Sequence, residues 1–179
     1  MQFINIGIVF VIGYRETASV EKHKYIQTGE IAISVNNESL ASSPLGSCIA
    51  VVVYDKLKSI GGIAHILLPG KSLSKNKKEE NKYAENAVSN LLKQMKENGS
   101  NSENLEFCLL GGANVLKRPD DSIAKNMCDS IRQIAERRHL NVKAASLGGL
   151  QRRNVVLDME LGKVRLSVGD DKERDFYVY

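Results

Sequence analysis

Two runs of strand-forming residues, separated by one short polar turn, constrain the fold more than any other feature of the sequence. The run "CIAVVVYD" ends at Asp55, the turn "KLKS" follows, and "IGGIAHILLPG" comes next. Both runs are rich in β-branched and other apolar residues, a pattern that predicts two buried strands paired as an antiparallel hairpin. Cys48 opens the first run and His65 lies in the second, so the hairpin brings a thiol and an imidazole onto neighbouring strands.

Upstream of the hairpin, "KYIQTGEIAISV" predicts two short extended pieces around a Thr-Gly kink, and "NNESLASSPLG" predicts a polar loop. Downstream, the Lys-rich "KSLSKNKKEEN" predicts an exposed, mobile loop. Apolar residues then recur at helical spacing, with Glu79 and Glu80 expected in the first turn and Asn98-Gly99 as the stop signal.

The second half of the chain predicts a strand in "LEFCLLGG" and a second helix. The inner face of that helix is expected to carry Ile123, Met127, Ile131 and Ile134. Three final strands are expected in "NVKAASLGG", "NVVLDME" and "GKVRLSV". Strands before, between and after two helices favour an α+β fold with largely antiparallel pairing.

Length and composition favour a single compact unit. The chain has 179 residues, of which 42% are hydrophobic and 26% charged, and it shows no internal repeat and no linker. Its net charge of +4 comes from 25 Lys and Arg mixed with 21 Asp and Glu, without one long basic tract. That pattern does not indicate nucleic-acid binding.

The N-terminal stretch from Phe3 to Ile12 is almost wholly apolar. No positive residue precedes it, no small-residue cleavage site follows it, and it is too short to span a bilayer. We therefore expect a strand-like extension, or sequence upstream of the functional start, and no insertion into a membrane. The three cysteines form no C-x-x-C pair and are odd in number, which indicates a reducing compartment and favours a cytoplasmic protein.

Cofactor and metal sites are not expected from the motifs. The three Gly-Gly pairs lack the spacing of a P-loop or a dinucleotide fingerprint, and no pair of Cys or His has metal-ligand spacing. Chemistry is left to the cysteines and histidines. Cys108 and Cys128 sit in apolar patterns typical of packing, and His139 at a helix end is explained by the helix dipole. For Cys48 and His65, pattern alone leaves open a catalytic pair or a strand cysteine beside a core histidine.

Four segments, "LGSCIAVVVYD", "GGIAHILLPG", "NKYAENAV" and "LLGGANVL", resemble in order the chemoreceptor glutamine deamidase family, CheD. The family pattern has a Gly-Ser-Cys turn before a hydrophobic strand and a histidine 17 residues after the cysteine, as here. The resemblance covers residues 24–168 as a deamidase domain, leaving 1–23 as an extension and 169–179 as a C-terminal tail. It implies a β-sandwich-like core of antiparallel and mixed sheets with two main helices on one side, like that of cytotoxic necrotizing factor-like cysteine hydrolases.

The resemblance also implies the site. Cys48 would be the nucleophile and His65 its general base, with the Cys48 N–H as first candidate for the oxyanion hole. The family's third residue is a threonine six positions before the cysteine, where this chain has Ser42, so the imidazole would be held less firmly. Ser43 is an alternative, and the Pro44 that follows it is atypical for the loop and biases Ser43 toward an extended conformation.

The implied substrates are glutamines of methyl-accepting chemotaxis proteins, and the implied partner is a CheC-type phosphatase. Two other functions remain open: a catalytically weak binding module that regulates such a phosphatase or the receptor array, and a thiol hydrolase of small amides. The segment "SLGGLQRR" lacks the family's usual acidic residue and Asn-Arg pair. It indicates altered substrate docking, or a structural turn in which Arg152 and Arg153 face solvent.

Overall fold

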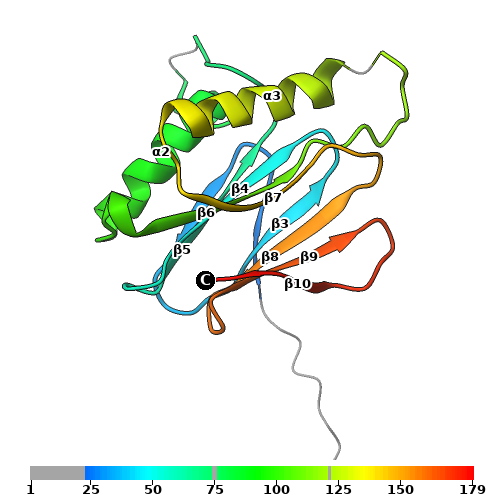
Figure 1. Ribbon diagram of the computed structural model, residues 1–179. Coiled ribbons are helices and arrows are strands. Elements are labelled where there is room, and N and C mark those ends of the chain that lie inside the picture. The colour runs from blue at the N-terminus through cyan, green and yellow to red at the C-terminus, as the bar shows by residue number, and fades with distance from the viewer. Residues whose placement is uncertain (1–22, 74–75, 121) are drawn as a thin grey trace, which may run out of the picture.

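The computed structural model describes residues 23–73, 76–120 and 122–179. Two β-sheets are stacked face to face, and the two main helices cover the outer face of one of them (Figure 1). The sheet that the helices cover is called the central sheet. The second sheet, which packs on the face of the central sheet away from the helices, is called the back sheet. The predicted α+β class, with a sandwich-like core and two main helices on one side, is confirmed.

The central sheet is mixed, since β7 runs parallel to β6 while the other neighbours are antiparallel. Its strands, in spatial order, are β2 (Ile31–Ser34), β5 (Ile60–Ile66), β4 (Ile49–Asp55), β6 (Leu105–Gly111) and β7 (Val142–Leu147). The back sheet is also mixed, with one parallel pair between β1 and β3. Its strands, in spatial order, are β1 (Lys24–Ile26), β3 (Leu40–Leu45), β8 (Arg153–Asp158), β9 (Lys163–Val168) and β10 (Arg174–Val178).

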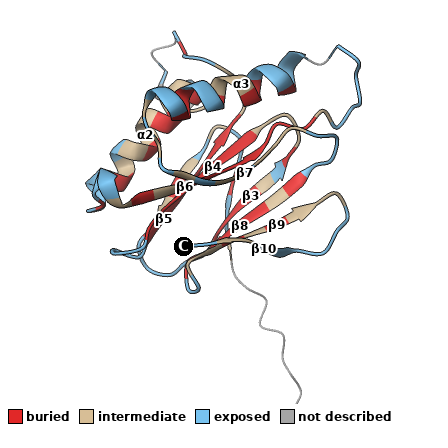
Figure 2. Cartoon of the chain, in the orientation of Figure 1, coloured by how far each residue is buried: buried red, intermediate tan, exposed pale blue. Residues whose placement is uncertain are grey.

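The predicted hairpin forms the middle of the central sheet. β4 and β5 pair antiparallel along their whole length, with Ala50 opposite His65, and every residue of both strands is buried. Both faces of the sheet are therefore covered, which explains why the two runs are continuously apolar and do not alternate with polar residues. Figure 2 shows this burial along β4 and β5 and on the inward sides of the helices.

Two apolar layers follow from the alternation of side chains along β4. Ile49, Val51 and Val53 pack against the helices, whereas Ala50 and Val52 pack into the space between the sheets. The second layer also receives Leu45, Leu157 and Leu166 of the back sheet. A side chain of β4 can thus be assigned to the helix side or the inter-sheet side from its position along the strand.

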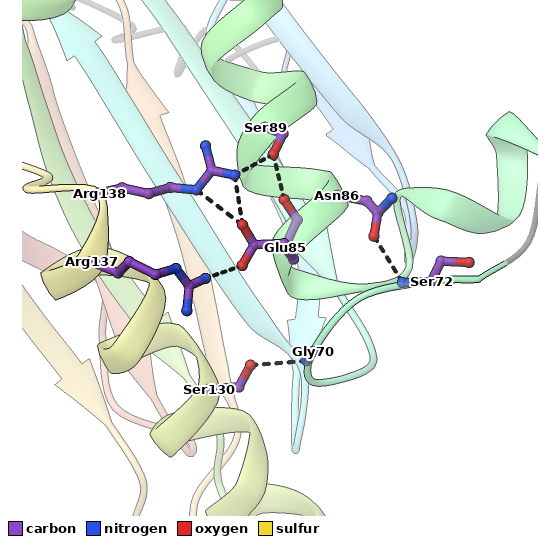
Figure 3. A network of polar contacts seen from close by, with 8 residues as sticks. All are labelled: Gly70, Ser72, Glu85, Asn86, Ser89, Ser130, Arg137 and Arg138. Carbon is purple, nitrogen blue, oxygen red and sulfur yellow. Dashed lines mark hydrogen bonds and ion pairs between the residues drawn. The ribbon is translucent and has the colours of Figure 1, made fainter.

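The two main helices are α2 (Ala84–Glu97) and α3 (Ser122–Arg137). Glu85 of α2 accepts from Arg137 and Arg138 at the end of α3, and Arg138 Nη2 also donates to Ser89 Oγ at 2.7 Å (Figure 3). At the other end of the contact, Gly70 N donates to Ser130 Oγ at 2.9 Å. This network fixes α3 against α2 and against the loop that follows β5.

Several boundaries differ from the predictions. Glu79 and Glu80 belong to a separate short helix, α1 (Lys77–Glu80), and α2 begins only at Ala84 because residues 81–82 form a turn instead of continuing the helix. Tyr83 at that point is extended, and its neighbour Leu68 forms an isolated bridge with it.

Two strands were not predicted. The polar segment expected as a loop contains β3, whose residues Leu40 to Ser42 pair with β8 and are buried, with Leu40 in the inter-sheet core. The segment expected as a C-terminal tail, 169–179, contains β10, which pairs with β9. The N-terminal extension to residue 22 lies outside the described residues. Across the described part of the chain, no helix is long and apolar enough to cross a membrane.

Candidate active site

Cys48 lies in the turn that enters β4, between the exposed Pro44 and the fully buried Ile49. Its carbonyl accepts from Gly112 N at 2.8 Å, and the carbonyl of Gly46 accepts from Ala113 N at 2.8 Å. Two backbone hydrogen bonds therefore hold the cysteine turn against the loop after β6. The thiol is half-buried and packs against the edge of the inter-sheet core.

Gly111 and Gly112 explain why the loop after β6 carries a glycine pair. Both have positive φ, 119° and 69°, a region that glycine adopts without steric cost. A Cβ on Gly111 would lie 2.2 Å from the Cys48 carbonyl oxygen, and one on Gly112 would lie 2.3 Å from Cys128 Sγ. The pair is needed so that this loop can approach the cysteine turn, which spacing alone did not indicate.

His65 is 1% exposed and lies in β5 directly opposite Ala50. Residues opposite one another in an antiparallel pair point to the same face, so the imidazole enters the inter-sheet space, and Cys48, two positions before Ala50, shares that face. Such diagonal neighbours are about 7–8 Å apart between Cα atoms in a regular ladder. The hairpin therefore places Cys48 and His65 at the same end of neighbouring strands and on one face of the central sheet.

Two hydroxyls of β3 reach the His65 ring across the gap between the sheets. Ser42 Oγ lies 3.2 Å and Ser43 Oγ 3.1 Å from Nδ1. Successive residues of a regular strand point to opposite faces. Here the β3–β8 register shifts between Ser42 and Leu45, around Pro44, which has no N–H to lose from the ladder. This irregularity lets both serines face the imidazole, so the structure brings together both alternatives that the sequence left open.

The serines also bear on the tautomer of the ring. Ser42 Oγ donates its proton to the Ser43 carbonyl at 2.9 Å, so toward Nδ1 it has only lone pairs to offer, which favours a ring protonated at Nδ1. The Ser43 hydroxyl is able to accept from Nδ1 or to donate to it. In the tautomer that Ser42 favours, Nε2 keeps the lone pair of the neutral imidazole and is the atom able to accept a proton.

A third hydroxyl comes from the turn between β1 and β2. Thr28 Oγ1 lies 3.4 Å from His65 Nε2. The same turn also binds the backbone of His65 through two hydrogen bonds. Gly29 N donates to His65 O at 2.8 Å, and His65 N donates to Glu30 O at 3.0 Å. The sequence predicted a kink at Thr28-Gly29 but gave no signal that this kink contacts the histidine.

Burial governs the pKa values of both candidate residues. Desolvation raises the pKa of the Cys48 thiol above its usual 9.0, while the hydrogen bond from its own backbone N–H acts in the opposite direction. Desolvation lowers the pKa of His65 below its usual 6.5, against smaller opposing effects of the Ile26 carbonyl and the Glu30 charge. Both directions favour a neutral thiol and a neutral imidazole. Within the described residues, no hydrogen bond joins Cys48 Sγ to the His65 ring.

The other two cysteines have different surroundings. Cys108 is 0% exposed in the inter-sheet core, where it accepts from Tyr179 Oη at 3.6 Å and burial raises its pKa to about 11. Cys128 is buried in α3 and donates to Gly112 O at 3.5 Å. Both are packing residues. His139 lies exposed beyond the end of α3, where its N–H donates to Glu136 O at 3.1 Å. Among the described residues, no backbone hydrogen bond joins it to the Cys48 turn.

In the segment "SLGGLQRR", one of the two arginines expected to face solvent does so and the other is buried. Arg152 faces solvent and pairs with Asp170 at 2.9 Å, but Arg153 is 7% exposed and donates to Ser146 Oγ at 3.0 Å. The expectation that both arginines face solvent is wrong for Arg153, because its place in β8 directs it between the sheets. It ties the back sheet to β7. In the described parts of the chain, no group of three or more His, Cys, Asp or Glu is placed to hold a metal ion.

Comparison with known proteins identifies the family. The sequence model described as "CheD chemotactic sensory transduction" matches residues 67–168. Relatives named "Probable chemoreceptor glutamine deamidase CheD" include one from Chlorobium luteolum, 34% identical over 157 residues, which cover 88% of this chain and 78% of the relative. A second, from Methanococcus maripaludis, is 32% identical over 148 residues, which cover 82% of this chain and 95% of the relative.

An alignment as long as the Chlorobium luteolum one includes Cys48 and His65, which lie outside the segment 67–168. The chain therefore belongs to the CheD family.

Among solved structures, the Bacillus licheniformis hypothetical protein YfiH is similar with a TM-score of 0.42 and 14% identity, over 72% of this chain and 60% of that one.

Proposed function

We propose that this protein is a chemoreceptor glutamine deamidase that hydrolyses glutamine side chains to glutamate and ammonia through a Cys48 thioester. The observation that carries the proposal is the arrangement around His65. A half-buried cysteine shares its face of the sheet, and the Ser42 hydroxyl at Nδ1 favours the tautomer in which Nε2 is the proton acceptor. Membership of the CheD family, with relatives named as deamidases, supplies the reaction and the substrate class.

The first half of the reaction forms the thioester. His65 Nε2 takes the thiol proton, and the Cys48 thiolate attacks the carboxamide carbon of the substrate. The carbonyl π electrons move to the oxygen and give a tetrahedral oxyanion. When the oxyanion collapses, the C–N bond breaks, His65 returns the proton to the departing nitrogen, and ammonia leaves.

The second half regenerates the thiol. Water gives a proton to His65 Nε2 and attacks the thioester carbon, forming a second oxyanion. Its collapse breaks the C–S bond, the sulfur recovers the proton from His65, and glutamate is released. Both oxyanions need a hydrogen-bond donor already in place, and the Cys48 backbone N–H is the first candidate. This N–H already lies close enough to the thiol to lower its pKa.

The surface beside Cys48 suits a protein substrate. An open depression of about 480 Å³ is lined by Pro44 and Gly46 of the cysteine turn, by Val115, and by Leu150. Val115 and Leu150 are 40% and 54% exposed, so apolar side chains border the turn without enclosing it. A small amide would find little enclosure there, whereas the side of a helix could lie against it.

The consequence for a receptor is electrostatic. Conversion of glutamine to glutamate adds a negative charge to a receptor helix, where like charges three or four residues apart repel one another. We propose a cytoplasmic location for this reaction, with a CheC-type phosphatase as a partner that restrains it.

One observation favours a second function. The ring nitrogens of His65 contact Thr28, Ser42 and Ser43, and none of these contacts is with Cys48. A protein that kept the fold chiefly to bind a phosphatase or the receptor array would tolerate such an unpaired thiol. The second proposal is therefore a catalytically weak binding module.

One experiment separates the two functions. The purified protein is incubated with a chemoreceptor cytoplasmic fragment, and ammonia release is measured together with site-specific Gln-to-Glu conversion by mass spectrometry. Deamidation requires both signals in the wild type and neither in Cys48→Ala. Binding of a CheC-type protein without ammonia release would instead support the binding module.

A further inference from the structure

The contact between Thr28 and His65 has no role in the reaction steps above. Thr28 Oγ1 lies 3.4 Å from Nε2, the nitrogen that must accept the thiol proton. In the tautomer that the Ser42 bond to the Ser43 carbonyl favours, Nδ1 holds the ring proton and Nε2 holds the lone pair. A hydroxyl beside that lone pair donates to it. Thr28 thus occupies the acceptor that Cys48 needs.

The position of Thr28 is set by the backbone of its turn. Gly29 N and Glu30 O both bond the main chain of His65, at 2.8 and 3.0 Å. Glu30 Oε2 also accepts from Gln27 N at 2.8 Å, which closes the turn. Gly29 has φ of 81°, and a Cβ there would lie 2.9 Å from Lys82 Cγ. The turn is therefore built to lie against His65, with Thr28 at its tip.

We propose that Thr28 is a positioning residue of this site, which holds Nε2 of His65 and keeps the imidazole unpaired from Cys48 in the resting protein. Catalysis then requires the hydrogen bond between the Thr28 hydroxyl and Nε2 to break, so that Nε2 accepts from the Cys48 thiol instead. The lowered pKa of His65 and the raised pKa of Cys48 agree with a neutral, unpaired resting state. The inference rests on the proposed function, because it assigns control of the same pair.

The first test reads the ring directly in the wild type. Imidazole ¹⁵N chemical shifts at a pH where His65 is neutral should show a protonated Nδ1 and an unprotonated, hydrogen-bonded Nε2. A ring protonated at Nε2 would overturn the inference, because Thr28 would then face an N–H and could not block a lone pair. This measurement needs no substitution and no substrate.

The second test reads the thiol by alkylation with iodoacetamide, quantified on the Cys48 peptide by mass spectrometry. Thr28→Val keeps the side-chain shape and removes the hydroxyl, and Thr28 is exposed, so the fold should be retained. Losing one hydrogen bond at Nε2 should make Cys48 alkylation about two- to tenfold faster at neutral pH. Thr28→Ser restores the hydroxyl and should react at the wild-type rate.

Each other outcome counts against the inference. A wild-type alkylation rate in Thr28→Val, or a slower one, would overturn it, as would a Thr28→Ser protein that behaves like Thr28→Val. Cys48→Ala in the Thr28→Val background should remove the signal, since Cys108 and Cys128 are buried. Alkylation requires no receptor, so a protein without deamidase activity can still pass or fail this test.

Discussion

Cys48 and Cys108 lie on the same face of the same sheet, and burial raises the pKa of both, yet their surroundings differ. Cys108 is sealed in the core and accepts from the phenol of Tyr179. Cys48 is half-buried in a glycine-supported turn and shares its end of the sandwich with His65 and the hydroxyls around that ring. The direction of the thiol pKa shift therefore does not distinguish the candidate nucleophile from a packing cysteine. A neighbouring proton acceptor and an open approach do.

Exchanging the two cysteines for alanine should give the largest difference. Cys48→Ala should lower the deamidation rate by at least about 10⁴-fold, because no other group can form the thioester. Cys108→Ala should keep the rate within about twofold while lowering the free energy of unfolding by about 1–2 kcal/mol, through a small cavity and the lost phenol contact. Rates by ammonia release and stabilities by urea titration check both. Loss of turnover in a folded Cys108→Ala protein would show that the assignment of the reaction to Cys48 is wrong.

Removing the proton acceptor should have the next largest effect. His65→Gln should reduce the deamidation rate by about 10²–10⁴-fold, the usual contribution of a general acid–base group. Circular dichroism and urea titration of the variant separate this loss from unfolding, which matters because His65 is fully enclosed. A folded His65→Gln protein with more than half of the wild-type rate would show that the thiol works without this histidine.

The hydroxyls at Nδ1 should have smaller and shared effects. We expect Ser42→Ala and Ser43→Ala to lower kcat by about tenfold or less each, because either serine can still orient the ring, and the double variant to lose more than the product of the two. Ser42→Thr adds the χ1 restriction of a β-branched side chain and should match or exceed the wild type. If the double variant retains full kcat with unchanged KM, the serines do not position the histidine.

The pH dependence should follow the lowered pKa of His65. An imidazole that is already protonated cannot accept the thiol proton, so kcat/KM should fall about tenfold per pH unit on the acid side. Since the folded-state pKa lies below 6.5, this limb should appear only below that pH. Glu30 is the ionisable group whose charge acts on the ring, and Glu30→Gln should move the limb to still lower pH, because that charge raises the His65 pKa. A limb above pH 6.5 would contradict the burial of a neutral ring.

The smallest effect is expected at the Cys108 end. Tyr179→Phe removes the hydrogen bond to Cys108 but keeps the ring, which packs against Tyr54 and Tyr177. The free energy of unfolding should fall by about 0.5–1.5 kcal/mol, and the deamidation rate should not change. A changed rate would mean that the two ends of the inter-sheet core are coupled.

Much of this comparison was predictable from sequence. The continuous apolar runs around "KLKS" predicted the hairpin, and its register follows from the short turn, so the neighbourhood of Cys48 and His65 was set by local pattern. The role of Cys48 was not: pattern alone favoured a structural cysteine, and the family resemblance reversed that order. The assignment of Ser42 stays a prediction, although its contact with Nδ1 is consistent with it.

What sequence missed comes from contacts between distant segments. β3 is rich in serines and contains a proline, so its composition favours a loop, and only pairing with β8 makes it a strand. The contact of Thr28 with His65 depends on how the β1–β2 turn docks onto β5, and the glycine pair matters because it meets the Cys48 carbonyl. None of these contacts leaves a periodic signal along the chain.

The central claim, that Cys48 forms a covalent bond with the substrate glutamine, is tested most directly by trapping that bond. The protein is mixed with a chemoreceptor cytoplasmic fragment, quenched in acid during turnover, and digested for mass spectrometry. We expect a conjugate between the Cys48 peptide and a glutamine-containing receptor peptide, lighter than their sum by one ammonia and absent from Cys48→Ala. Deamidation without such a conjugate, or a conjugate at Cys108 or Cys128, would contradict it.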